Sequence, residues 1–136
     1  MADKPMPAHP AELDGFDGIA RRSVSSGRIF GWKLQNAVGE QCLVRHRTPM
    51  ILDDPEAMAA AAMHGSGIAL VPMPHAARWL QEGKLVRLLP GWFSDLGVIS
   101  LYYPSKKLLP PKTRVFVDFV VDAFRERRLK TRFDSR

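Results

Sequence analysis

The side chains best suited to catalysis or metal binding in this chain are its histidines, its single cysteine and its serines. None of the four histidines is spaced as a metal ligand with another histidine or with Cys42. The serines lie outside any Gly-x-Ser-x-Gly elbow. Arg45 and His46 are the only cationic neighbours of Cys42, so a buried, inert thiol is the simpler interpretation. We therefore expect no catalytic residue, no metal and no cofactor.

Two further clusters resemble parts of known sites. Residues 65–67, Gly-Ser-Gly, resemble a nucleotide-binding loop, but they follow a predicted helix and precede a strand, which reverses the order that this motif requires. Asp53, Asp54 and Glu56 form an acidic cluster just before that helix. A carboxylate pair for catalysis or cation binding is one interpretation of this cluster. Helix capping explains the same three residues with fewer assumptions.

The elements that must position these residues alternate between strands and helices. Apolar periodicity and turn residues predict strands at residues 16–21, 30–34, 41–45, 50–52, 67–71, 85–89 and 98–103. Helices are expected at residues 10–13, 55–64, 74–80 and 111–127. In the second strand, Phe30, Trp32 and Leu34 should face one way, and a turn at residues 36–39 makes a hairpin with the third strand. The alternation predicts an α/β fold with a mixed, mostly parallel sheet flanked by helices.

Two of the helices carry strong local patterns. Asp54 is a good N-cap, Pro55 suits the first helical position, and Gly65 is a natural stop. The last helix has apolar residues at intervals of three and four, namely Phe116, Phe119, Val120, Ala123 and Phe124. We expect this stripe to pack against a substantial partner, and its size predicts self-association if the partner is absent.

Composition excludes several classes of protein. The 136 residues are 46% hydrophobic, which is enough for a core, and no apolar run approaches the ~18 residues of a membrane span. No secretory signal is recognisable at the N-terminus, so we expect a cytoplasmic protein without a membrane partner. The net charge is +6, but residues 125–136 contain six basic and two acidic residues, so the excess charge lies in this tail. The tail is interpreted as a solvated helix end, with a phosphate-binding arm as the alternative.

A family resemblance covers residues 7–126. Residues 53–72, DDPEAMAAAAMHGSGIALVP, resemble the second regulatory subdomain of LysR-type transcription regulators. Three surrounding segments add to the resemblance: HPAEL at 9–13, GKLVRLLPGW at 83–92, and YYPS at 102–105 together with LLPPKTRVFVDF at 108–119. No single motif is decisive, but their order along the chain is specific.

The resemblance implies a periplasmic-binding-protein-like (type 2) fold, in which two α/β lobes hold a small effector in the cleft between them. Residues 8–97 would form the second, effector-binding subdomain after an entering linker at 1–7. Residues 98–127 would be a hinge strand and helix that return to the first subdomain, followed by a basic tail at 128–136. The family's winged helix-turn-helix and part of its first subdomain have no counterpart in this sequence, so DNA would be contacted only through the absent N-terminal domain.

The residues expected to face the effector lie at predicted strand ends. They are Leu52, Asp53, Asp54 and Pro55 at the strand-to-helix junction, Arg21, Arg22 and Ser23 at the end of the first strand, and Ser100 and Tyr102 on the hinge strand. Free N–H groups at a helix start favour anions. The resemblance to LysR-type regulators implies a small-molecule effector, often an organic acid, so an organic acid or an aromatic compound is the expected effector. A homodimer or higher oligomer is also expected. A solute-binding module and a small uncharacterised enzyme are the alternative functions.

Overall fold

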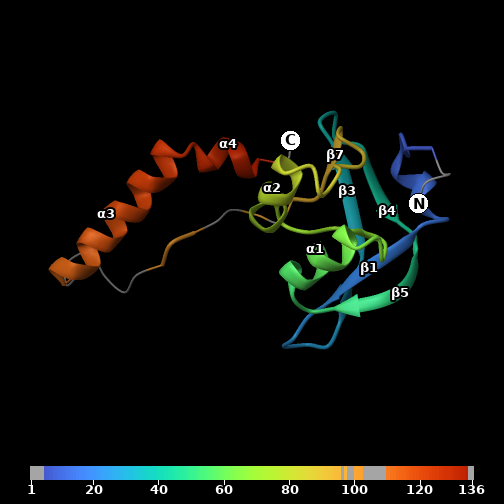
Figure 1. The fold of residues 1–136 in the computed structure, drawn as a ribbon, viewed down its shortest axis with the longest axis horizontal. Helices are drawn as coiled ribbons and strands as arrows, with labels where there is room; N and C mark the ends of the chain where they lie inside the picture. Colours follow the sequence, from blue (N-terminus) through green and yellow to red (C-terminus); the bar gives the residue numbers. More distant parts are fainter. Residues whose placement is uncertain (1–4, 96, 98–99, 103–109, 135–136) are drawn as a thin grey trace. The chain divides into compact units, whose positions relative to one another are not determined.

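The computed structural model describes residues 5–95, 97, 100–102 and 110–134. These residues divide into two compact units, with the boundary between residues 95 and 96. The first unit contains every strand of the described chain together with two α-helices, and the second contains two further helices. Figure 1 shows the ribbon of both units, coloured along the sequence.

The strand β1 (Asp17–Arg22) is the centre of the first sheet, and a short 3-10 helix, η1 (Pro10–Leu13), precedes it. One edge of β1 pairs in parallel with β5 (Arg47–Leu52). The other edge of β1 pairs antiparallel with β2 (Ile29–Phe30) and parallel with β6 (Ile68–Ala69). The first sheet is therefore mixed and mostly parallel, as expected.

The chain changes sheets at Gly31. The next strands, β3 (Trp32–Asn36) and β4 (Gln41–Val44), form an antiparallel hairpin in a second sheet. The prediction of one strand over residues 30–34 is therefore wrong: Phe30 belongs to the first sheet and is 47% exposed, whereas Trp32 and Leu34 are buried in the second. A glycine inside an apolar pattern often marks such a break.

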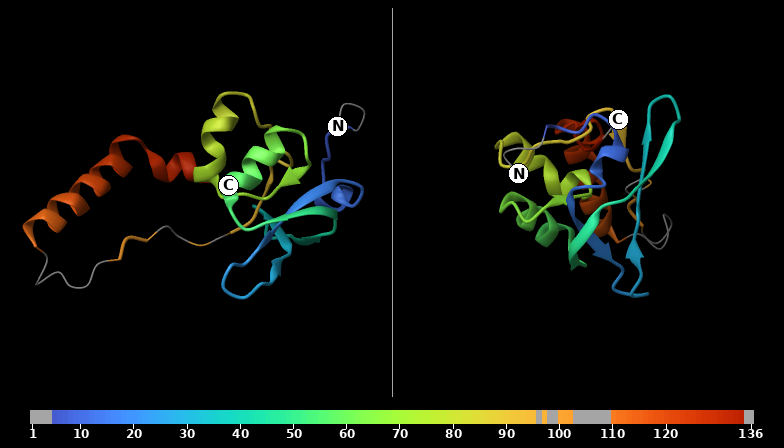
Figure 2. Two further views of the ribbon diagram at one scale, coloured as in Figure 1. Left: turned by 60° about the horizontal axis from the view of Figure 1, so that its bottom comes forward. Right: turned by 90° about the vertical axis from the view of Figure 1, so that its right-hand side faces the viewer.

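The helix after β5 has the predicted capping. The helix α1 (Pro55–Met63) begins with proline, and the Asp54 carboxylate accepts a hydrogen bond from the Glu56 N–H at 2.9 Å. The helix packs on β1, β5 and β6 and against α2 (Met73–Gln81). Seen from the side, α1 and the β3–β4 hairpin lie on opposite sides of β1 (Figure 2, right).

The strand predicted at residues 85–89 does not form. The N–H groups of Lys84 and Leu85 instead both donate to the Trp79 carbonyl, which wraps the chain around the end of α2. Leu89 has a φ of 52°, which is incompatible with a continuous strand. The strand in this region is β7 (Trp92–Phe93), which pairs antiparallel with β3 and was not predicted.

One hydrophobic cluster of the first unit is formed where the second sheet, η1, β6 and the segment before β7 meet. Its buried members are Leu13, Trp32, Leu34, Val44, Ile68 and Leu89. Leu88 and Leu89 thus serve the core as an irregular segment rather than as a strand. Cys42, expected to be buried, is half-buried on β4.

The second unit contains α3 (Pro111–Glu126) and α4 (Leu129–Phe133). No residue of α3 is fully buried, and its predicted apolar stripe is only partly covered: Phe116 and Phe119 are exposed, whereas Val120, Ala123 and Phe124 are half-buried. The tail was expected to be a frayed helix end. It turns at Arg128, with a left-handed φ of 49°, into a separate helix whose Phe133 ring lies 6.4 Å from that of Phe124.

The hinge strand predicted at residues 98–103 is not present where the chain can be described. Residues 100–102 are irregular, and Tyr102 is 90% exposed. Residues 98, 99 and 103 lie outside the described part. An isolated apolar run needs a neighbouring strand to satisfy its backbone, and none of the described strands pairs with residues 100–102.

Candidate effector site at the edge of the first sheet

The candidate site lies where the two parallel strands β1 and β5 end side by side. In their register Arg21 lies opposite Leu52, so the residues that follow each strand emerge at the same edge of the sheet. Ligands of open α/β sheets bind outside the carboxyl ends of parallel strands. Two groups that are far apart in the sequence, residues 21–23 and 52–55, are thereby brought to one edge.

The β5 side of this edge contributes the start of α1. Asp54 is used as the helix cap, because its Oδ1 accepts the Glu56 N–H. Pro55 occupies the first helical position and has no N–H to offer a ligand. Asp53 is exposed and forms none of the capping bonds, so its carboxylate remains available at the edge. Leu52 is half-buried beneath it.

The β1 side is a turn stabilised by its own hydrogen bonds. The Ser23 N–H donates to the Arg28 carbonyl at 2.8 Å, and the Gly27 N–H donates to the Ser23 carbonyl at 2.9 Å. The Ser23 Oγ accepts the Ser26 N–H at 3.2 Å. Gly27, with a φ of 67°, supplies the left-handed residue that this tight turn requires. Ser23 is therefore mainly a turn residue, and only part of its hydroxyl remains for a ligand.

The two arginines of β1 have different surroundings. The Arg21 guanidinium lies 4.9 Å from the centre of the Phe30 ring, a cation–π contact across the β1–β2 pair. Arg22 is exposed at the last position of the strand. Of the two, Arg22 is better placed to meet an anion from solvent.

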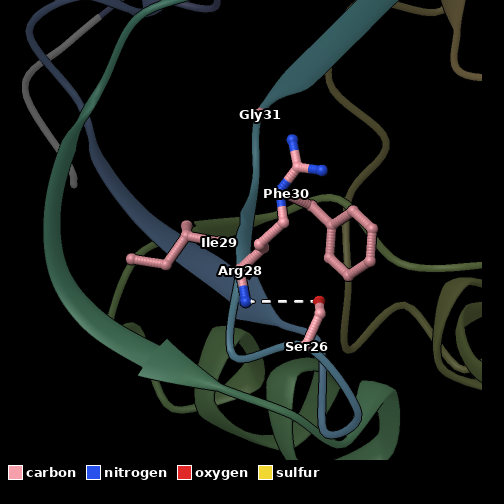
Figure 3. A pocket seen from close by; sticks show the side chains of 5 residues that line it. All are labelled: Ser26, Arg28, Ile29, Phe30 and Gly31. Atoms are coloured by element: carbon pink, nitrogen blue, oxygen red, sulfur yellow. Dashed lines mark hydrogen bonds between the residues drawn. The ribbon is translucent and has the colours of Figure 1, made fainter.

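Next to this turn is a hollow of about 230 Å³ that sequence reasoning missed. Figure 3 shows its lining, which comprises Ser26, Arg28, Ile29, Phe30 and Gly31. The Arg28 N–H donates to the Ser26 Oγ at 3.4 Å, which holds the turn against the start of β2. Arg28 and the exposed Phe30, which both precede Gly31, could have pointed to this hollow, but only if Phe30 had been assigned to a strand paired with β1.

Ser100 and Tyr102 are placed differently from the other predicted site residues. Both belong to the second unit, and both are exposed on an irregular segment.

Among the described residues, no group of three or more His, Cys, Asp or Glu side chains is arranged to hold a metal ion. None of the described helices is long and apolar enough to cross a bilayer.

Comparison with known families decides the classification of this chain and its fold. The model of the LysR substrate binding domain matches residues 2–125. The chain belongs to this family. Among curated relatives, an HTH-type transcriptional repressor of Pseudomonas aeruginosa (strain UCBPP-PA14) is 31% identical over 117 residues, covering 86% of this chain and 37% of the relative. A regulator of Xanthomonas campestris pv. campestris is 32% identical over 119 residues, covering 85% and 34%.

Solved structures of LysR-type regulators have the same fold. The regulatory domain of AphB from Vibrio vulnificus superposes with a TM-score of 0.69 at 26% identity, covering 90% of this chain and 59% of that one. Full-length Vibrio cholerae AphB also gives 0.69 at 26% identity, covering 90% and 41%. The periplasmic-binding-protein-like α/β fold expected for this LysR substrate-binding domain is thus confirmed. The relatives named here are transcriptional regulators rather than enzymes, and the chain spans just over a third of their length.

Proposed function

We propose that this chain is the effector-sensing domain of a LysR-type transcription regulator, and that its effector binds at the edge formed by the ends of β1 and β5. The observation that carries this proposal is the parallel register of Arg21 with Leu52 in a chain that belongs to the LysR substrate-binding domain family. It brings the exposed Arg22 and Asp53 to one edge of the sheet, beside the start of α1.

The charges at the edge suit a small polar molecule. Arg22 and Arg28 are exposed cations that would attract the carboxylate of an organic acid. Asp53 would face a hydroxyl or a cationic group of the same molecule, and Phe30 offers an apolar surface to an aromatic one. In a complete regulator, Ser100 and Tyr102 would supply further contacts. Binding free energy that differs between open and closed lobes would shift the population between them.

The remaining expectations about the whole regulator rest on family membership. We propose that residues 8–97 form the second regulatory subdomain, that residues 98–127 return to the first, and that residues 1–7 and 128–136 are a linker and a basic tail. The division of the described residues near residue 95 supports this boundary. We also propose a cytoplasmic homodimer or higher oligomer that reads DNA through a separate N-terminal domain.

Thermal-shift screening with organic acids and aromatic compounds tests the proposed site. A ligand at 100 times its dissociation constant should stabilise the domain by about 2.7 kcal/mol. Arg22→Gln and Asp53→Asn should each remove most of that stabilisation. Lys33→Gln is the matched control, because Lys33 is an exposed cation on β3 in the other sheet.

Two outcomes would contradict the proposal. One is a ligand that still stabilises the domain fully in Arg22→Gln and in Asp53→Asn but no longer stabilises it in Lys33→Gln. The other is measurable turnover of a screened compound with no stabilisation by any ligand, because that result would favour a small enzyme over a sensor.

A further inference from the structure

A second hollow lies on the face of β1, where the two strands of the β3–β4 hairpin separate. Trp32 and Val44 are still paired in the second sheet. Beyond this pair the two segments reach opposite edges of β1. The segment before Trp32 contains β2, in which Phe30 lies opposite Arg21, and the segment after Val44 leads into β5 on the other edge. The hairpin therefore opens into a fork above the middle of β1.

The hollow in the fork is open to solvent and has a volume of about 310 Å³, near the lower limit of volumes typical for ligand pockets. Ala20 of β1, which is fully packed and carries only a methyl group, lines it, so β1 leaves the space open. The two arms of the fork supply the rest of the lining, namely Ile29, Phe30, Gly31 and Trp32 on one arm and Val44, Arg45, His46 and Thr48 on the other. One arm is thus mainly apolar, with the indole N–H of Trp32 as its polar side-chain group, and the other arm carries the charged and hydroxyl side chains.

The geometry of the polar arm is fixed by His46. Its ring lies 4.1 Å from the Trp32 ring, and it rests on the backbone of Gly18, where any Cβ would overlap it. The ring Nδ1 lies 3.0 Å from the Arg47 carbonyl, which can only accept, so Nδ1 carries the hydrogen. The Thr48 Oγ1 lies 3.3 Å from the same nitrogen and accepts from it, which leaves the hydroxyl hydrogen free to donate.

The fork also carries an unopposed positive charge. Arg45 is exposed and, within the described part of the chain, has no acidic partner. Its neighbour Arg47, in contrast, is paired with Asp17 at 3.0 Å. No acidic side chain lines the hollow. A flat apolar arm facing a cation and a hydroxyl donor matches a molecule that has a ring at one end and a carboxylate at the other.

We propose that this fork is a binding site for small aromatic carboxylates, with the ring against Phe30 and Ile29 and the carboxylate toward Arg45 and Thr48. The site lies on the face of β1 within the first unit and shares only Phe30 with the residues proposed above for the effector edge. A molecule bound here would hold the two arms at a fixed separation. Because one arm continues into β2, it would also restrain the segment that lines the hollow of Figure 3.

Titration of the whole chain with phenylacetate, followed by ¹H–¹⁵N NMR, tests the site. Saturable shifts are expected at the Trp32 indole and at the Val44 and Thr48 amides. Phenylacetamide has the same ring without the charge and should bind at least about tenfold more weakly, since a hydrogen bond to a charged group contributes about 1.5–3 kcal/mol.

Three variants separate the fork from its surroundings. Arg45→Gln should weaken phenylacetate binding about tenfold, whereas Arg47→Gln, an exposed neighbour outside the lining, should change it less than about twofold. Ala20→Leu should abolish binding by filling the hollow, and Arg45→Gln keeps the proposal testable if Ala20→Leu fails to fold. Equal binding of the acid and the amide would overturn carboxylate recognition. Shifts confined to residues 21–23 and 52–55 would overturn the fork site while agreeing with the proposed effector edge.

Discussion

Asp54 shows how one side chain can define the start of an element at the proposed site. Its carboxylate caps α1 through the Glu56 N–H, and the neighbouring Asp53 does not. Replacing an N-cap aspartate by alanine costs about 1 kcal/mol. We expect Asp54→Ala to lower the free energy of urea unfolding by about that amount. Asp53→Ala is the control and should leave stability almost unchanged; equal losses in both variants would contradict the capping role.

Glu82 should make a small, pH-dependent contribution at the end of α2. Hydrogen bonds from Lys84 at 2.8 Å and from Arg78 at 2.7 Å hold the pKa of the Glu82 carboxyl below its usual range. Because the folded pKa is the lower one, this stabilisation is present at neutral pH and is lost as pH falls through that pKa. Glu82→Gln should therefore slightly lower Tm at pH 7 and have no effect well below about pH 4. A deficit in Tm that persists in acid would contradict this assignment.

Residues whose roles depend on near neighbours in the sequence were predictable, and those that depend on distant ones were not. The Asp54 cap is a contact between residues two positions apart, so its pattern is visible in the sequence. The His46 ring rests on Gly18, and Arg21 lies on Phe30. No local pattern reveals such contacts, because they exist only once β1 has acquired its neighbours. The candidate edge was therefore predicted, but the fork and the hollow at the β1–β2 turn were not.

At the scale of elements, hydrogen-bonded neighbours decided which apolar runs became strands. Residues 17–22 have a partner along both edges and form β1. Residues 85–89 have an equally strandlike pattern, but the end of α2 takes up the N–H groups at 84 and 85, and the leucines enter the core from an irregular segment. An apolar pattern in the sequence indicates which side chains become buried. It does not show that the backbone forms a strand, because side chains can also be buried from an irregular segment.

The exposed aromatic residues of α3 are expected to govern association. Phe116 is 58% exposed and Phe119 is 67% exposed on this helix. Phe119→Glu places a charge in the middle of the stripe, so it should reduce self-association measured by sedimentation velocity over a range of concentrations. The unfolding midpoint of the first unit should not change, because the helix belongs to the other unit. Asp118→Glu, on an exposed polar position of α3, is the control.

At the scale of the whole molecule, the charge of +6 predicts weak, non-specific contact with nucleic acid. The excess lies mainly in residues 125–136, outside the first unit's sheets. In gel-shift assays with duplex DNA, the chain should bind weakly, and binding should fall steeply as salt is raised. Removing residues 128–136 should weaken it further. Tight binding that depends on the DNA sequence would contradict the proposal that DNA is read by a separate N-terminal domain.

The central position of β1 has a consequence for how the protein is made. β1 is synthesised before β2, β5 and β6, the strands that complete its edges. A nascent chain emerges N-terminus first, so the backbone of β1 stays without its full set of partners until Ala69 has left the ribosome. During that interval the apolar Ile19 and the unpaired N–H groups beside it are exposed to chaperones and to other nascent chains. The strand at the centre of the finished sheet thus spends part of translation without the neighbours that bury it.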